Sequence, residues 1–104
     1  MAKFHLTNKA VEDLADIWNY TVETWSERQA DDYYEMLVAS CAQIAEYPQL
    51  LGKCYDDILE GLRGYKVKKH ILFYRILSDN DVEIIRILHE QMDLQNRMNA
   101  SLQS

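Results

Sequence analysis

The sequence has little glycine and proline, with only three glycines and one proline among 104 residues. Gly52, Gly61 and Gly64 do not form the closely spaced glycine motifs that bind phosphate groups, which argues against a nucleotide-binding loop. No run of about 18 apolar residues is present, so we expect no membrane-spanning helix. The segment Met1–Thr7 lacks the apolar stretch of a signal peptide, and we therefore expect a cytoplasmic protein.

Cysteine is also scarce, since Cys41 and Cys54 are the only two thiols. Two isolated cysteines form no metal motif, and thiols in the cytoplasm are normally reduced. Cys41 falls on the apolar side of a predicted helix, which favours a small core residue. A regulatory disulfide between the two remains the alternative.

Positive charge is in the minority, with 11 Lys and Arg against 17 Asp and Glu and a formal net charge of −6. This balance argues against nucleic-acid binding, in which clustered positive charge supplies most of the affinity. The stretch 63–75 nevertheless holds five basic residues and no acidic one. Such a strip indicates either a local contact surface for a partner or solvated lysines that protect a sheet edge from aggregation.

Two amphipathic helices are predicted in the first half of the chain. Apolar residues recur at helical spacing from Asn8 to Trp25, after Thr7, which can cap the first turn. Ser26, with Gln29 three positions later, is a capping-box pattern for a second helix that runs to about Tyr47. Pro48 prevents its continuation. Because almost nothing separates the two helices, they should pack as an antiparallel hairpin.

The rest of the pattern is typical of strands. Residues 3–6 read as a short strand, and residues 49–62 as a loop or a short irregular strand. The three longer strand-like runs cover residues 62–67, 70–77 and 82–89, and the last two flank a turn at 78–81. The sequence thus predicts an α+β fold of order β-α-α-β-β-β, with a helix hairpin on a small, mostly antiparallel sheet. We expect a single domain over 1–104, with a polar, flexible tail from about 94.

The last hairpin can be given a register, in which paired residue numbers sum to 159. His70 then faces His89, Phe73 faces Arg86, and Arg75 faces Ile84. In this register Arg75 and Arg86 are diagonal neighbours on one face of the sheet. The opposite face, which we assign to the helix-packed core, carries Leu72, Tyr74, Ile76, Ile85 and Ile87.

No catalytic triad or cofactor motif can be argued from spacing. Three histidines give a weak metal signal, and the predicted His70–His89 pair is expected to be solvated or hydrogen-bonded rather than metal-bound. We therefore expect no metal and no cofactor. Arg75 and Arg86 lie within apolar runs, so each must pair with a carboxylate, bond to backbone carbonyls or face solvent. The structural interpretation is a salt bridge to the acidic first helix or stacking on a tyrosine, and the functional one is recognition of an anion or a partner by two adjacent guanidinium groups. Trp25, at a helix end, is a candidate for a binding surface.

Several of these residues resemble the ParE family of bacterial toxins. The first half of the resemblance includes Leu6-Thr7, Asp13-Leu14 and Tyr20-Thr21. The second half includes Gly61-Leu62-Arg63, Phe73-Tyr74-Arg75 and the most specific piece, Arg86-Ile87-Leu88-His89 with Met92-Asp93. The match covers roughly residues 4 to 93.

The resemblance implies the toxin of a type II toxin–antitoxin system, which inhibits DNA gyrase by binding, without catalysis. It also implies neutralisation by a cognate ParD-like antitoxin and an oligomeric complex with it. The related RelE branch cuts mRNA on the ribosome, but Ile71 stands here where that branch carries a catalytic arginine. The alternatives are a RelE-type endonuclease acting through Arg63, Arg86 and His89, and a non-toxic interaction module of the same fold.

Site residues follow from the pattern and the resemblance together. We expect the antitoxin to contact the helix hairpin and a sheet edge through Trp25, Tyr33 and the strip from Arg63 to Lys66. Asp93 or an acid of the first helix should anchor Arg86, or Arg75 and Arg86 should face the target instead. His89 and Met92 should fix the tail against the domain.

Overall fold

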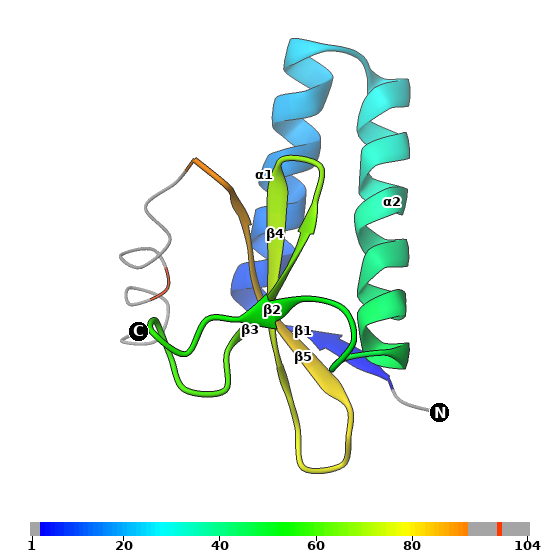
Figure 1. Cartoon of the computed structure of the whole chain (residues 1–104). Helices are drawn as coiled ribbons and strands as arrows, with labels where there is room; N and C mark the ends of the chain where they lie inside the picture. The colour runs from blue at the N-terminus through cyan, green and yellow to red at the C-terminus, as the bar shows by residue number, and fades with distance from the viewer. Residues whose placement is uncertain (1–2, 92–97, 99–104) are drawn as a thin grey trace.

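The computed structural model describes residues 3–91 and residue 98 of the chain. It has two helices beside a five-stranded sheet (Figure 1), which confirms the predicted α+β class. The elements are β1 (Phe4–Leu6), α1 (Asn8–Thr24), α2 (Glu27–Glu46), β2 (Lys53–Cys54), β3 (Arg63–Val67), β4 (His70–Ile76) and β5 (Val82–His89).

Local capping contacts explain where the helices begin. The Thr7 hydroxyl accepts a hydrogen bond from the amide of Ala10 at 3.1 Å and donates one to the carbonyl of Ile85 at 2.7 Å. Ser26 caps α2 in the same way by accepting from the amide of Gln29 at 3.1 Å. The cap at Thr7 also ties the start of α1 to β5. The predicted helix boundaries are therefore confirmed to within one residue.

The strands lie in the order β1-β5-β4-β3-β2. β1 pairs with β5 in parallel, and the other neighbours are antiparallel, so the two ends of the fold meet in the sheet. The expected irregular segment 49–62 contributes the two-residue strand β2 at the far edge. In Figure 1 the tip of the helix hairpin extends past the turn between β3 and β4. In the described part of the chain, no helix has the length and apolar content needed to cross a membrane.

Both faces of the sheet are covered by apolar side chains. On the helix side, residues of both helices pack against Leu72, Tyr74, Val82, Ile84 and Ile87. A second cluster contains Leu62, Ile71, Phe73, Ile85, Leu88 and Met98, with Tyr55, Ile58 and Leu59 of the 49–62 segment against it. Met98 falls in the stretch predicted as a polar tail, yet its side chain is fully buried.

A β-bulge in β5 changes the predicted register of the last hairpin. His70 faces His89 and Phe73 faces Arg86, as predicted, but the pairing then shifts by one residue. Ile85 is the extra residue, so Arg75 faces Glu83 and not Ile84. The assignment of Ile85 to the helix-packed face was wrong, because the bulge places it in the second cluster. Ile76, also assigned to that face, is only half-buried.

A candidate partner-binding groove

A large open groove lies between the helix hairpin and the end of the sheet, with a volume of about 1310 Å³. The hairpin tip extends beyond the β3–β4 turn (Figure 1), and residues of both helices line the groove together with residues of that turn. The groove is lined by Asp16, Ile17, Tyr20, Thr21, Thr24, Trp25, Gln29, Asp32, Tyr33, Met36, Lys68, Lys69, His70, His89 and Gln91. It exceeds the roughly 300–1,000 Å³ of small-molecule sites, so a protein segment fits its size better.

Tyr33, His70 and His89 form a polar cluster in the groove. The Tyr33 hydroxyl and His70 Nδ1 share a hydrogen bond of 2.6 Å, and the two imidazole rings meet edge to face at 5.3 Å. Burial, and then the charge of His89, lower the pKa of His70 to about 4. Burial also raises the pKa of Tyr33. Tyr33 and His70 are therefore both uncharged at neutral pH.

The arrangement of His89 does not favour a metal between the two histidines. Its Nδ1 accepts a hydrogen bond from the amide of Gln91 at 3.1 Å, so in the neutral ring the proton sits on Nε2. Across residues 3–91 and 98, no group of three or more potential metal-binding side chains comes together. The His70–His89 pair is instead hydrogen-bonded on both rings.

The two walls of the groove carry opposite charges. Asp16 of α1 and Asp32 of α2 lie on the helix wall, and Lys68 and Lys69 of the β3–β4 turn lie on the sheet wall. All four side chains are exposed. None of them makes an ion pair with another described residue, unlike several other charged groups of the chain.

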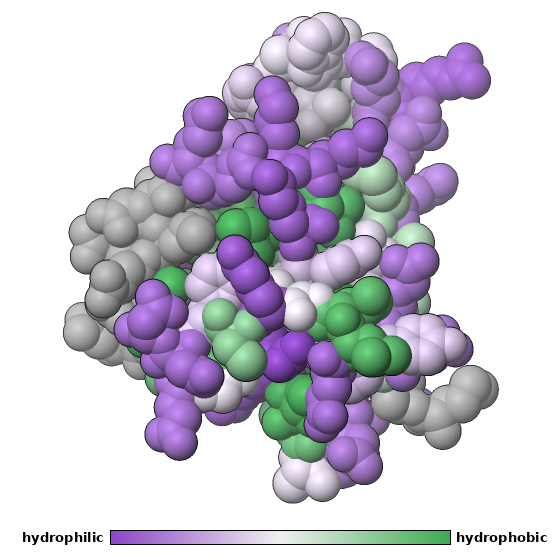
Figure 2. Space-filling model, in the orientation of Figure 1, coloured by the Kyte–Doolittle hydropathy of each residue, from purple (hydrophilic) through white to green (hydrophobic). Residues whose placement is uncertain are grey.

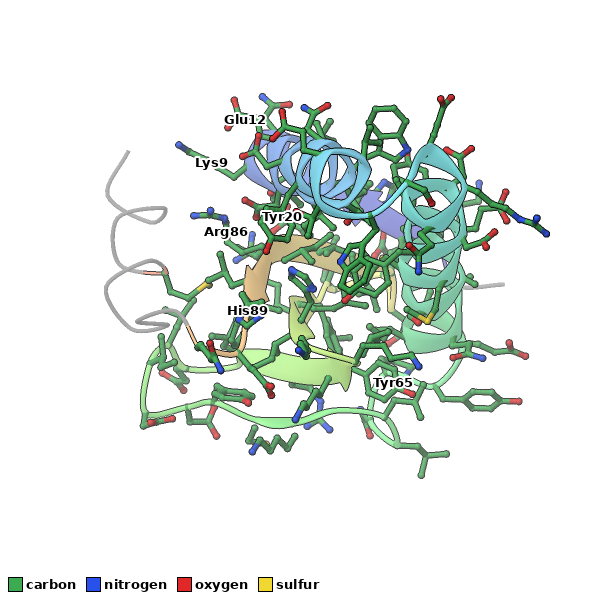
Figure 3. The ribbon with its side chains drawn as sticks, turned by 90° about the horizontal axis from the view of Figure 1, so that it is seen from above. Lys9, Glu12, Tyr20, Tyr65, Arg86 and His89 are labelled. Atoms are coloured by element: carbon green, nitrogen blue, oxygen red, sulfur yellow. The ribbon has the colours of Figure 1, made fainter. Side chains whose placement is uncertain are left out.

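Two large aromatic side chains stand at the hairpin side of the groove. Trp25 is 70% exposed and Tyr20 is 67% exposed. Figure 3 shows Tyr20 between α1 and the strand end that carries His89. On the face seen in Figure 2, hydrophobic residues are exposed as separate patches among hydrophilic ones. Exposed aromatics beside a groove are typical of protein-binding surfaces.

Arg86 forms a partly buried ion pair with Asp13 of α1. Its Nε and Nη2 donate to the two carboxylate oxygens at 2.7 and 2.9 Å, and Asp13 also accepts from the amide of Ile87 at 3.0 Å. The side chains are only 13% and 11% exposed. The hydrogen bond to Asp13 raises the pKa of Arg86. The prediction that an acid of the first helix anchors Arg86 is confirmed. The Asp13 carboxylate therefore also accepts from the Ile87 amide of β5, at a position where β1 no longer pairs with β5.

Arg63 holds the loop between α2 and β2 against the sheet. Its Nη2 donates to the carbonyls of Gln49, Leu51 and Gly52 at 3.1 to 3.4 Å, and its Nε donates to the Tyr74 hydroxyl at 3.3 Å. The Tyr74 hydroxyl lies 2.6 and 2.8 Å from the carbonyls of Pro48 and Leu51, to which it donates. The hydrogen bond to Tyr74 raises the pKa of Arg63. We call these contacts the Arg63 network.

Arg75 and Lys66 each form an ion pair at the surface of the sheet. Arg75 Nε lies 2.8 Å from Glu83 on the neighbouring strand, and Lys66 Nζ lies 2.6 Å from Glu90. Arg75 and Arg86 therefore bind different carboxylates, so they do not form a joint anion site of two unpaired guanidinium groups.

The structure brings together only some of the predicted site residues. Trp25, Tyr33 and His89 line the groove. The predicted cationic residues all have partners within the chain: Arg63, Lys66, Arg75 and Arg86. Met92 and Asp93 lie outside the described residues, so their predicted roles stay predictions.

Among the charged and aromatic residues that line the groove, Asp16, Tyr20 and Asp32 were not predicted as site residues. Tyr20 could have been noticed, because it is an aromatic residue off the apolar stripe of its helix. Lys68 and Lys69 belong to the basic strip 63–75, which was interpreted either as a contact surface or as solvated lysines at a sheet edge. Nothing in the sequence indicates that these segments face each other.

Comparisons with known proteins agree with this architecture. Residues 4–94 match the family described as "ParE toxin of type II toxin-antitoxin system, parDE". Toxin ParE1 of Caulobacter vibrioides is 38% identical over 93 residues, which span 89% of this chain and 94% of that toxin. The chain belongs to the ParE toxin family. Toxin ParE of Escherichia coli is 30% identical over 100 residues, covering 94% of each chain.

A solved structure shows the same fold as this ParE-family chain. It is titled "Chromosomal ParDE TA system from P. aeruginosa", and it superposes with a TM-score of 0.76 at 18% identity. The match covers 86% of this chain and 96% of that one. The predicted resemblance to ParE toxins, which rested on short motifs, is thus confirmed by the family match and the relatives.

Proposed function

We propose that this ParE-family toxin inhibits DNA gyrase by binding, without catalysis, and that a ParD-like antitoxin neutralises it. The observation that carries the proposal is the groove, whose size, exposed aromatics and charges that form no ion pair with a described residue suit a protein segment. Family membership supports the toxin role and, with it, the pairing with an antitoxin. We place the antitoxin in the groove, with Trp25 and Tyr33 among its contacts.

The geometry gives little support to the RelE-type endonuclease. Arg63 pairs with Tyr74, whereas His89 pairs with His70, four residues along β4. The two positions are therefore roughly 13 Å apart along the strand. Arg86 is bound to Asp13, so the three residues of that alternative do not form one cluster. Ile71, where RelE toxins carry an arginine, is a core residue at 6% exposure.

The test compares the two activities on the same purified protein. We expect it to inhibit supercoiling by DNA gyrase and to leave ribosome-bound mRNA uncut in a reconstituted translation reaction. Site-specific mRNA cleavage without gyrase inhibition would replace the proposal with the endonuclease. The absence of both activities, with antitoxin binding retained, would indicate a non-toxic interaction module.

Groove variants then connect the activity to the structure. Trp25→Ala and Tyr20→Ala remove exposed aromatics of the groove, and Tyr47→Ala is a matched control because Tyr47 is 50% exposed at the other end of α2. We expect antitoxin affinity to fall about tenfold or more for the first two variants and to stay unchanged for the third. Equal affinities for all three would place the antitoxin elsewhere.

A further inference from the structure

We propose that the groove selects and orients its occupant by charge. The occupant is an amphipathic segment with basic side chains along one edge and acidic side chains along the other. This inference rests on the proposed function in taking an antitoxin segment as the occupant. The inference adds the charge pattern that the segment must carry and the direction in which it must lie in the groove.

The two walls of the groove carry charges of opposite sign. The helix wall presents Asp16 and Asp32, and the opposite wall presents Lys68 and Lys69. A segment with a single sign of charge on both edges would meet repulsion on one wall. A segment with basic and acidic edges meets attraction on both, and only when each edge faces the correct wall.

The four wall residues differ from other charged groups in the described part of the chain. Lys66, Arg75 and Arg86 each pair with a carboxylate of this chain. The four wall residues make no ion pair with any described residue. Lys69 helps to lower the pKa of Glu90 without forming an ion pair with it. Since all four side chains are exposed, their charges also act on whatever enters the groove.

The groove between the walls sets the remaining requirements. Ile17 and Met36 offer apolar contacts, so the middle of the segment must be apolar. Tyr33 and His70 are bonded to each other, so they offer a polar but uncharged floor at neutral pH. Because an α-helix turned end for end exchanges its two edges, opposite charges on the walls permit only one direction of the bound helix.

A panel of three synthetic helical peptides tests the inference without any antitoxin. All three carry the same apolar stripe, and their edges are one Lys edge and one Glu edge, two Glu edges, or two Lys edges. Binding of each fluorescently labelled peptide is measured by anisotropy. The wild-type protein should bind the mixed peptide about tenfold tighter than either single-sign peptide, since each exposed pair contributes modestly.

Charge-reversal variants make the test decisive. Lys68→Glu with Lys69→Glu should change the preference to the peptide with two Lys edges. Asp16→Lys with Asp32→Lys should change it to the peptide with two Glu edges. The control exchanges Arg75 and Glu83, an exposed pair outside the groove, and should keep the wild-type preference. The four wall residues and Arg75 are exposed and Glu83 is partly exposed, so the variants should fold.

Two results would overturn the inference: the same peptide ranking for all variants, or no measurable binding of any peptide to the wild-type protein. Either result leaves the gyrase and antitoxin assays unaffected, because the peptides take no part in them. Loss of gyrase inhibition and antitoxin binding, with the peptide ranking as expected, would instead overturn the proposed function and leave a charge-selective groove.

Discussion

Asp13 and Asp16 lie one turn apart on α1, yet they have opposite surroundings. Asp13 is 11% exposed and accepts hydrogen bonds from Arg86 and from the amide of Ile87. Asp16 is exposed in the groove and makes no ion pair with another described residue. A partly buried charge with several hydrogen bonds inside the fold contributes to stability, whereas an exposed charge that forms no ion pair with a described residue can be used for binding.

The largest expected effect comes from removing one partner of the ion pair between Asp13 and Arg86. Asp13→Ala leaves the Arg86 guanidinium and the Ile87 amide without this acceptor, so the free energy of unfolding should fall on the order of 3 kcal/mol. Asp16→Ala, its matched control, should change it by less than about 0.5 kcal/mol. Urea unfolding of both variants measures the difference. Equal losses would contradict the distinction between the two aspartates.

Arg86→Ala extends the same comparison to function. Its melting temperature should drop by roughly 10–20 °C for a loss of about 3 kcal/mol, and the double variant with Asp13→Ala should lose less than the sum of the two. Melting and growth arrest on expression are measured together. Wild-type stability with growth arrest abolished would show that Arg86 serves the target and not the fold.

The next effect concerns the Arg63 network. Tyr74→Phe removes the hydroxyl that accepts from Arg63 and donates to the loop carbonyls. Stability should fall by about 1–2 kcal/mol, and amide exchange should accelerate in residues 48–54. Tyr65→Phe is the control, because the Tyr65 hydroxyl makes no hydrogen bond with a described residue. If both variants behave alike, the network does not hold the loop.

A smaller effect concerns pH and the groove cluster. The pKa of His70 falls from the ordinary 6.5 to about 4, mainly through burial. The unfolded chain therefore binds more protons in this range, so stability is present above pH 6.5 and is lost as the pH falls toward 4. With partial exposure taken into account, the loss is on the order of 1–2 kcal/mol. Unfolding curves across this range should show a shallower loss for His70→Gln, and an unchanged slope would refute the assignment.

The smallest effect concerns the two thiols. Cys41 is 1% exposed, and burial raises the pKa of its thiol to about 11, whereas Cys54 is exposed. Iodoacetamide at neutral pH should therefore add a single label at Cys54 and leave stability unchanged. Both thiols should react in concentrated urea. Mass spectrometry that finds Cys41 labelled in the folded protein would show that this part of the core opens readily.

The elements of the fold were predictable because their signals are local. Thr7, Ser26 and Pro48 mark helix ends through their own backbone chemistry, and runs rich in Ile, Leu, Val and aromatic residues on either side of a turn marked the last two strands. The bulge at Ile85 was not predictable, since a symmetric pairing of the two strands looks equally apolar on both faces. The burial of Met98 was not predicted, because it depends on a surface that strands distant in the sequence form together.

The candidate site was less predictable than the fold. Arg63 was expected at a partner surface, but its acceptors are backbone carbonyls of another loop, which carry no sequence signal. The groove joins Tyr20 to Lys68 and Lys69, nearly fifty residues later, through tertiary packing alone. The acid partner of Arg86 was anticipated because a buried arginine requires one, and α1 offers several.

Hydrogen exchange with and without the bound antitoxin tests the central claim most directly. The hairpin tip at 24–29 and the turn at 67–70 border the groove and should exchange readily in the free protein. On binding, both segments should become protected, while the β4–β5 turn at 77–81, away from the groove, should stay unchanged. Protection confined to the 77–81 turn, or to the loop held by Arg63, would contradict the groove as the partner site.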